Sequence, residues 1–236
     1  MTKTTFLRYE NKYYLSADQY SKICRLLEPY TLPDEHCRNG GYFICDRYYD
    51  TAEHAFAVDA KLKHVYREKI RVRCYEKCGV DAAGQLFLEQ KMKLGGLGHK
   101  RRVEMGVSEA ESLMRGSTAP EEAQPINEMS YTFLRYQLLP SADISYYRTA
   151  LTAVDDPGIR ITMDTDISAR DMRAGCSYSL LSDDYIMEIK IPKSLPIWLV
   201  DILEQVGARP CSFSKYGKFI DASGYLTAAE RNNIYA

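Results

Sequence analysis

The most constraining stretch of this sequence is VYREKIRVRCYE, residues 65–76, in which charged and apolar side chains alternate. The first face of this alternation is Arg67, Lys69, Arg71 and Arg73, and the second is Tyr66, Glu68, Ile70, Val72 and Cys74. A period of two predicts a β-strand. Like charges along one face repel each other, so an anionic ligand is expected beside them. The alternative is a solvated edge strand, because edge strands often carry Lys.

Other strands are predicted along the chain, and at least six strands in all have a charged face and an apolar face. The other strands cover residues 6–15, 42–49, 85–93, 100–105, 144–153, 158–167 and 185–191. Helices are predicted after the N-cap residues Ser16 and Ser108 and over residues 53–60, 126–139 and 196–206, with a short one near the C-terminus. Charged faces on so many strands favour an α+β fold, an antiparallel β-barrel tunnel with a charged lumen and helices packed outside.

The predicted lumen carries more cations than carboxylates, although the whole chain has a net charge of -1. Its expected cations are Arg8, Lys12, Lys69, Arg71, Arg73, Lys91, Lys93, Lys100, Arg102, Arg148, Arg160 and Lys190, and its carboxylates are Glu10, Glu89, Glu104 and Glu188. Arg forks two hydrogen bonds to phosphate oxygens and Lys adds point charge, so a polyanion is the expected ligand. The carboxylates could hold a divalent cation, or could form plain cross-strand ion pairs with neighbouring lysines.

The remaining composition predicts one cytoplasmic domain spanning residues 1–236. The sequence has no internal repeat or clear linker, no apolar signal core, and no window near the roughly 20 apolar residues of a membrane span. Its seven Cys form no CxxC pair, which indicates reduced thiols. The sequence does not define an oligomeric state.

Seven short motifs, taken together and in order, resemble the VTC domain. They are Arg8-x-Glu10-x-Lys12-Tyr13, Ile70-Arg71-Val72-Arg73, Glu89-Gln90-Lys91, Tyr147-Arg148-Thr149-Ala150, Arg160-Ile161-Thr162-Met163-Asp164-Thr165, Met187-Glu188-Ile189-Lys190 and Ser212-Phe213-Ser214-Lys215-Tyr216. This is the polyphosphate polymerase domain of the vacuolar transporter chaperone complex and its bacterial relatives. It belongs to the triphosphate tunnel metalloenzymes, which are related to the CYTH enzymes.

The resemblance implies transfer of the γ-phosphate of ATP to a growing polyphosphate chain, with release of ADP and a divalent metal, Mn²⁺ in preference to Mg²⁺. It implies catalytic phosphate contacts from Lys12, Arg71, Arg73, Lys91, Arg148 and Arg160. Further phosphate-binding candidates are Arg8, Lys69, Lys93, Lys100, Arg102, Lys190, Ser214, Lys215 and Lys218, and Arg101 competes with Lys100 and Arg102 for one family position. The metal would be held by Glu188, with Glu10 and Glu89.

Two other functions stay open. A tunnel-fold hydrolase of inorganic triphosphate or of a nucleoside triphosphate would have nearly the same lumen. That family carries Glu-x-Glu-x-Lys on its first strand, whereas Arg8 stands at the first of these positions here, which favours the polymerase. A non-catalytic module that binds polyphosphate or a nucleotide is the third interpretation. Nucleic acid is not an expected partner, because no exposed aromatic platform is evident among the basic strands.

Overall fold

The computed structural model describes residues 9–37, 40–77, 79–95, 97–116 and 124–226. The strands are β1 (Tyr9–Leu15), β2 (Thr31–Pro33), β3 (Tyr42–Asp50), β4 (Tyr66–Cys74), β5 (Leu86–Leu94), β6 (Leu97–Met105), β7 (Leu139–Ala153), β8 (Arg160–Asp171), β9 (Ser177–Leu181), β10 (Tyr185–Ile191) and β11 (Arg209–Pro210). The helices are α1 (Ala17–Leu27), α2 (Ala55–Lys61), α3 (Val107–Met114), α4 (Gln124–Tyr136), α5 (Ile197–Val206) and α6 (Lys215–Ser223), with a 3₁₀ turn, η1, at Val80–Ala82.

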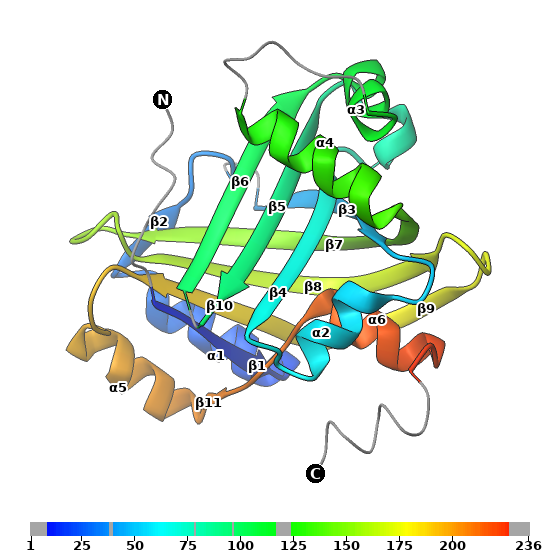
Figure 1. Ribbon diagram of the computed structural model, residues 1–236. Coiled ribbons are helices and arrows are strands. Elements are labelled where there is room, and N and C mark those ends of the chain that lie inside the picture. The colour runs from blue at the N-terminus through cyan, green and yellow to red at the C-terminus, as the bar shows by residue number, and fades with distance from the viewer. Residues whose placement is uncertain (1–8, 38–39, 78, 96, 117–123, 227–236) are drawn as a thin grey trace.

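All of these strands belong to one antiparallel sheet that folds over itself. Its hydrogen-bonded order is β11-β1-β10-β8-β7-β3-β4-β5-β6, with β2 added to β7 and β9 added to β8. In Figure 1, β4, β5 and β6 cross in front of β7, β8, β10 and β1, and the sheet passes between the two layers through β3. Among the described residues no ladder joins β6 to β1. The predicted α+β antiparallel architecture is confirmed, and the ring of backbone hydrogen bonds is interrupted at this position.

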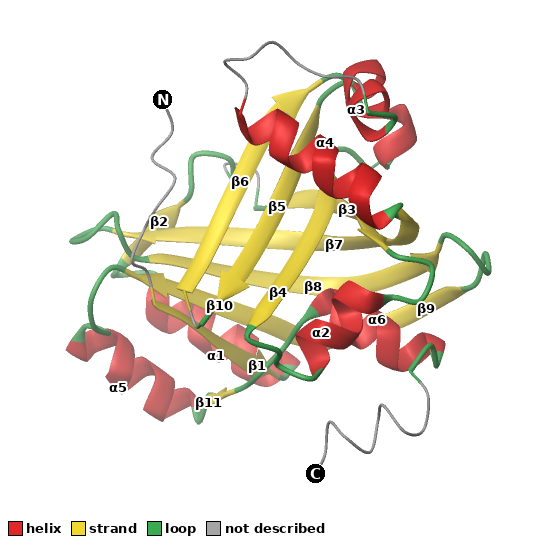
Figure 2. Cartoon of the chain, in the orientation of Figure 1, coloured by secondary structure: helices red, strands yellow, loops and turns green. Residues whose placement is uncertain are grey.

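The alternation along β4 places its apolar side chains on the outer face of the sheet, in a hydrophobic core under the helices, and its basic side chains on the inner face. Ile70, Val72 and Cys74 are fully buried on the outer face, where α3 and α4 cover the sheet. A second apolar cluster joins β1, β8 and β10 to α1 and α5, and a third joins β3, β7 and β8 to α6 (Figure 2). Because the apolar faces point outward to helices, the charged faces are left to surround the space between the layers.

The predicted strands and most predicted helices are confirmed, with local differences. Ser16 caps α1 in a reciprocal capping box with Gln19, and α5 follows Pro196 and ends at Gly207 in the left-handed conformation. The N-cap prediction for Ser108 is wrong, because α3 begins at Val107 after Gly106. No helix in the described chain is both long and apolar enough to cross a membrane.

Candidate active site

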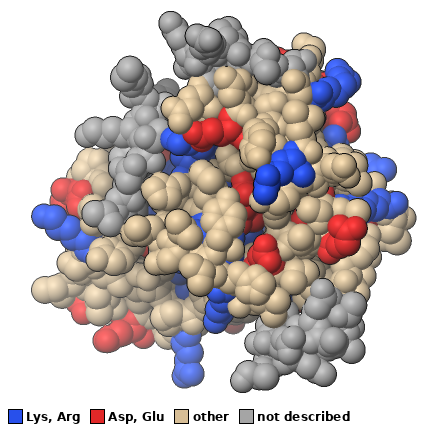
Figure 3. All heavy atoms as spheres, in the orientation of Figure 1, with Lys and Arg blue, Asp and Glu red and all other residues tan. Residues whose placement is uncertain are grey.

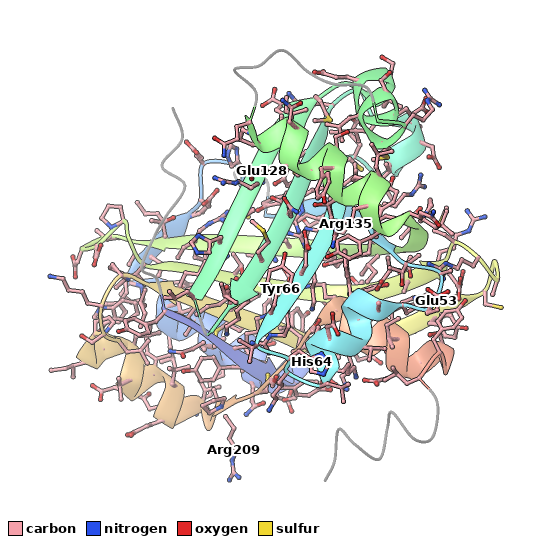
Figure 4. All side chains as sticks on the ribbon, in the orientation of Figure 1. Glu53, His64, Tyr66, Glu128, Arg135 and Arg209 are labelled. Carbon is pink, nitrogen blue, oxygen red and sulfur yellow. The ribbon has the colours of Figure 1, made fainter. Side chains whose placement is uncertain are left out.

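A cavity of about 750 Å³ lies between the two layers of the sheet. Its wall carries eleven Lys and Arg side chains against three Glu. On the outer face shown in Figure 3, by contrast, basic and acidic side chains are scattered among uncharged ones. Tyr66, Glu128 and Arg135 lie on this outer side, on β4 and α4 (Figure 4). The positive charge is therefore concentrated inside a molecule that is slightly acidic as a whole.

Asp46, on β3, fixes the two arginines at the centre of the cavity wall. Its buried carboxylate accepts hydrogen bonds from Arg71 Nη1 at 3.0 Å and from Arg73 Nε and Nη2 at 2.6 and 2.8 Å. The hydroxyl of Tyr146 donates to the same carboxylate at 3.1 Å. Burial opposes the charge of Asp46, but Arg71 and Arg73 outweigh it and hold the pKa of Asp46 below its usual value. The guanidinium groups are thus oriented before any ligand arrives.

A second buried anchor holds Arg148. Asp164, on β8, accepts from Arg148 Nε and Nη2 at 2.6 and 2.7 Å, in a bidentate pair, and also from Lys215 Nζ. Burial resists the negative charge, but Lys215 and Arg148 lower the pKa of Asp164 to about 2. Lys215 is the first residue of α6, so this contact fixes the start of that helix against the cavity wall.

Glu89, on β5, is surrounded by cations. Its Oε2 accepts from Arg71 Nε and Nη2 at 2.8 and 2.6 Å, and its Oε1 accepts from Lys100 and Arg102 at 2.5 and 2.9 Å. Burial resists its charge, but Arg71 and the other cations hold the pKa of Glu89 far below its usual value. Both oxygens are engaged, so the geometry of Glu89 is that of an anchor for basic side chains.

Two lysines on the wall have no carboxylate within ion-pair distance in the part of the chain that the structure describes. Lys69 donates only to Ser214 Oγ, at 2.9 Å, and burial with neighbouring Lys12 lowers the pKa of Lys69 to about 8. Burial together with Arg71 lowers the pKa of Lys91 to about 7. A bound anion would be a negatively charged partner for both ammonium groups.

Two carboxylates fit a divalent cation. Lys12 Nζ lies 3.3 Å from Glu10 Oε1 and 3.7 Å from Glu188 Oε2, so the two carboxylates are neighbours. Opposite Glu188 in the ladder, the buried hydroxyl of Thr162 has no hydrogen-bond partner among the residues that the structure describes. Within the described ranges no group of three or more His, Cys, Asp or Glu gathers as a ready-made metal site. One or two carboxylates, completed by phosphate oxygens and water, are nevertheless the usual ligands of Mg²⁺, and Mn²⁺ prefers the same donors.

Three aromatic rings line one end of the cavity. Tyr42 and Tyr75 meet edge to face at 5.8 Å, as do Tyr75 and Phe87 at 5.5 Å. The Arg102 guanidinium lies 4.0 Å from the Phe87 ring centre. The expectation that the basic strands carry no exposed aromatic platform is therefore wrong, since Tyr75 is 38% exposed. Tyr75 and Phe87 continue the same alternation that places Arg71 and Glu89 on the inner face.

The structure places most of the predicted site residues on the cavity wall. They are Glu10, Lys12, Lys69, Arg71, Arg73, Glu89, Lys91, Lys100, Arg102, Arg148, Arg160, Glu188, Lys190, Ser214 and Lys215. Lys93, Lys218 and the predicted lumen carboxylate Glu104 do not line it. Arg8 lies outside the described residues. Arg101 points outward to Glu128, 3.2 Å away, which leaves Lys100 and Arg102 as the inward alternatives. The anchors Asp46 and Asp164 were absent from the predicted site.

A folded-over antiparallel sheet around a basic cavity, with helices outside, is the architecture of the triphosphate tunnel fold. The sequence matches the VTC domain over residues 7–223, and the chain belongs to this family. Membership implies an enzyme that handles phosphate or triphosphate groups. The search of curated proteins finds no match.

Solved structures resemble this chain to different degrees. A Bacillus halodurans protein described as a candidate adenylate cyclase superposes with a TM-score of 0.51 at 14% identity, covering 89% of this chain and 94% of that one. The Mimivirus capping enzyme triphosphatase covers 84% of this chain and 88% of its own, at 9% identity and a TM-score of 0.36. The first likeness supports the fold alone, and the second is too distant to carry an inference.

Proposed function

We propose that this protein is a polyphosphate polymerase that transfers the γ-phosphate of ATP to the end of an inorganic polyphosphate chain and releases ADP. The observation that carries the proposal is the excess of cations on the cavity wall, eleven Lys and Arg against three Glu. A linear polyanion is the ligand that matches such a wall along its length. Family membership over residues 7–223 supports the same substrate class.

The chain's own contribution would be positioning and charge neutralisation, which dominate phosphoryl transfer. Arg71, Arg73 and Arg148 are held by buried carboxylates, so they would receive phosphate oxygens without reorganising. The nucleophile would be a terminal phosphate oxygen of the acceptor chain, so no covalent enzyme intermediate is required. Glu188 and Glu10 would hold a divalent cation, Mn²⁺ in preference to Mg²⁺, which supplies further neutralisation of the transferring group.

A triphosphatase is the second candidate, because water could replace the acceptor chain in the same cavity. The polymerase is preferred because Arg8 stands where the hydrolases carry a first-strand carboxylate. A binding module without catalysis is the third candidate.

Incubation of the protein with ATP and Mn²⁺ separates the three candidates. A ladder of polyphosphate on a gel, with ADP formed in step, is the expected result. Release of free phosphate without a ladder would instead identify a triphosphatase. Polyphosphate binding without ADP formation would identify a binding module.

A further inference from the structure

The more accessible aromatic rings of the cavity wall, Tyr42, Tyr75 and Phe87, lie together at one end, whereas Tyr48, Tyr146 and Phe213 on the rest of the wall are buried. Tyr75 directly follows β4, and Phe87 lies opposite Arg73 at the start of β5. Lys69 and Lys91 lie opposite each other four residues further along the same two strands. At the usual strand rise, these two levels are about 13 Å apart. The cavity therefore has an aromatic end and a lysine end.

Inorganic polyphosphate has no group that can use aromatic rings. Tyr75 is 38% exposed, and the guanidinium of Arg102, stacked on Phe87, is also accessible at this end. Aromatic rings and guanidinium planes are the surfaces on which nucleobases stack. The other aromatic residues of the wall, Tyr48, Tyr146 and Phe213, are at most 8% exposed, so the aromatic end is the part of the wall that fits an organic, planar part of the substrate.

We propose that Tyr75 and Phe87, with Arg102 and Tyr42, form a stacking subsite for the base of a nucleoside triphosphate. The inference rests on the proposed function and adds the direction in which the substrate lies. With the base at the aromatic end, the phosphates extend past Arg73 and Arg71, and the γ-phosphate lies nearest Lys69 and Lys91. Lys69 donates to Ser214 Oγ, and Lys12 donates to the backbone carbonyl of the preceding residue, Phe213, at 3.0 Å. Lys12 Nζ also lies 3.3 Å from Glu10 and 3.7 Å from Glu188, so both carboxylates lie at this lysine end. The donor phosphate and the carboxylates suited to a metal then meet in one place.

The test compares ATP with inorganic triphosphate as ligands of the same variants, both without metal. Tyr75→Leu and Phe87→Leu should each weaken ATP binding about tenfold, because one stacking surface is lost. Inorganic triphosphate should bind these variants as it binds the wild type. Tyr75→Phe keeps the ring and should keep ATP affinity, which separates stacking from the hydrogen bond that Arg102 donates to the Tyr75 hydroxyl.

Phe43 provides a matched control outside the cavity. It meets Tyr147 edge to face at 5.1 Å and has Lys77 at 5.0 Å from its ring centre, the same kinds of contact that Phe87 makes. Phe43→Leu should leave both affinities unchanged. If Tyr75→Leu lost the same affinity for ATP and for triphosphate, or lost affinity for neither, the stacking subsite would be overturned. Triphosphate binding by the wild type would still support an anion site in that case. Failure of the wild type to bind either ligand would overturn the proposed function as well.

Discussion

Lys69 shows how burial in a basic cavity wall lowers the pKa of a single lysine. In the folded protein the pKa of Lys69 is about 8, against an ordinary value of 10.5. The folded state therefore binds fewer protons than the unfolded state between these pH values, and stability should rise with pH across that window. A bound polyanion should restore the charge, so triphosphate binding at pH 9 should take up protons.

Calorimetry in two buffers of different ionisation enthalpy measures this proton uptake. Lys69→Arg is the control, because arginine keeps its charge at pH 9. The variant should bind triphosphate with a smaller uptake than the wild type. Equal uptake in both proteins would show that Lys69 is already charged in the empty cavity.

Glu188 should contribute mainly to metal-dependent turnover, and Arg71 should contribute mainly to the binding of phosphate. Glu188→Gln removes a carboxylate that fits the metal, so turnover with Mn²⁺ should fall by about two orders of magnitude or more. Metal-free triphosphate binding should persist or strengthen, because Lys190, 2.7 Å from Glu188, loses its anionic partner. Arg71→Ala should instead weaken metal-free binding by about 1.5–3 kcal/mol, the worth of a charge-assisted hydrogen bond.

Both variants are compared by titration with triphosphate and by the rate of ADP formation. Near-normal turnover of Glu188→Gln would show that this carboxylate only neutralises Lys190. Unchanged affinity of Arg71→Ala would exclude that side chain from the phosphate contacts.

At the residue scale, the alternating pattern predicted which face of the sheet each side chain occupies, but not how deeply the side chain is buried. It placed Arg71, Arg73 and Glu89 on the inner face, where the structure has them. It could not reveal that Asp46 is buried beneath the two arginines. A carboxylate at the cavity surface and one buried behind other side chains occupy the same kind of inward position in the sequence. The roles of these carboxylates depend on contacts between strands that are distant in sequence.

At the element scale, α6 connects helix capping to ligand binding. Ser214 Oγ accepts the backbone N–H of Gly217 at 3.1 Å, which caps α6, and also accepts from Lys69 Nζ. Ser214→Ala should lower the free energy of unfolding by about 1 kcal/mol through the lost cap. It should also weaken triphosphate binding, because Lys69 loses the contact that holds it on the wall.

Ser16→Ala is the matched control, since Ser16 caps α1 through Gln19 and does not line the cavity. Denaturant unfolding should show a similar loss of stability for both variants, and only Ser214→Ala should bind triphosphate more weakly. A comparable fall in affinity for Ser16→Ala would mean that general destabilisation, rather than Lys69, causes the effect.

Two of the strands that the sequence did not predict, β2 and β11, share a physical reason. The strands β2 and β11 have three and two residues, too few to display a period of two. They exist because β7 and β1 offer them an edge. The N-cap assignment of Ser108 failed although serine is a favoured cap, because the backbone enters the helix two residues earlier.

At the scale of the whole molecule, the uncompensated cations oppose folding until an anion binds. Triphosphate should therefore stabilise the native state by mass action, by about 2.7 kcal/mol at one hundred times its dissociation constant. Thermal unfolding with triphosphate should show a higher melting temperature than unfolding with chloride at the same ionic strength. Equal melting temperatures in the two salts would contradict a dedicated anion site.

The lack of a described backbone ladder between β6 and β1 bears on how a long polymer could enter or leave the cavity. A linear polymer enters or leaves a closed ring only by its end. Among the described residues no backbone hydrogen-bond ladder joins β6 to β1, so parting these strands loses none of the roughly 0.5–1.5 kcal/mol net that each such bond contributes. For the proposed polymerase, a gap between β6 and β1 would give a long polyphosphate product a lateral route out of the cavity, in addition to the route by its end.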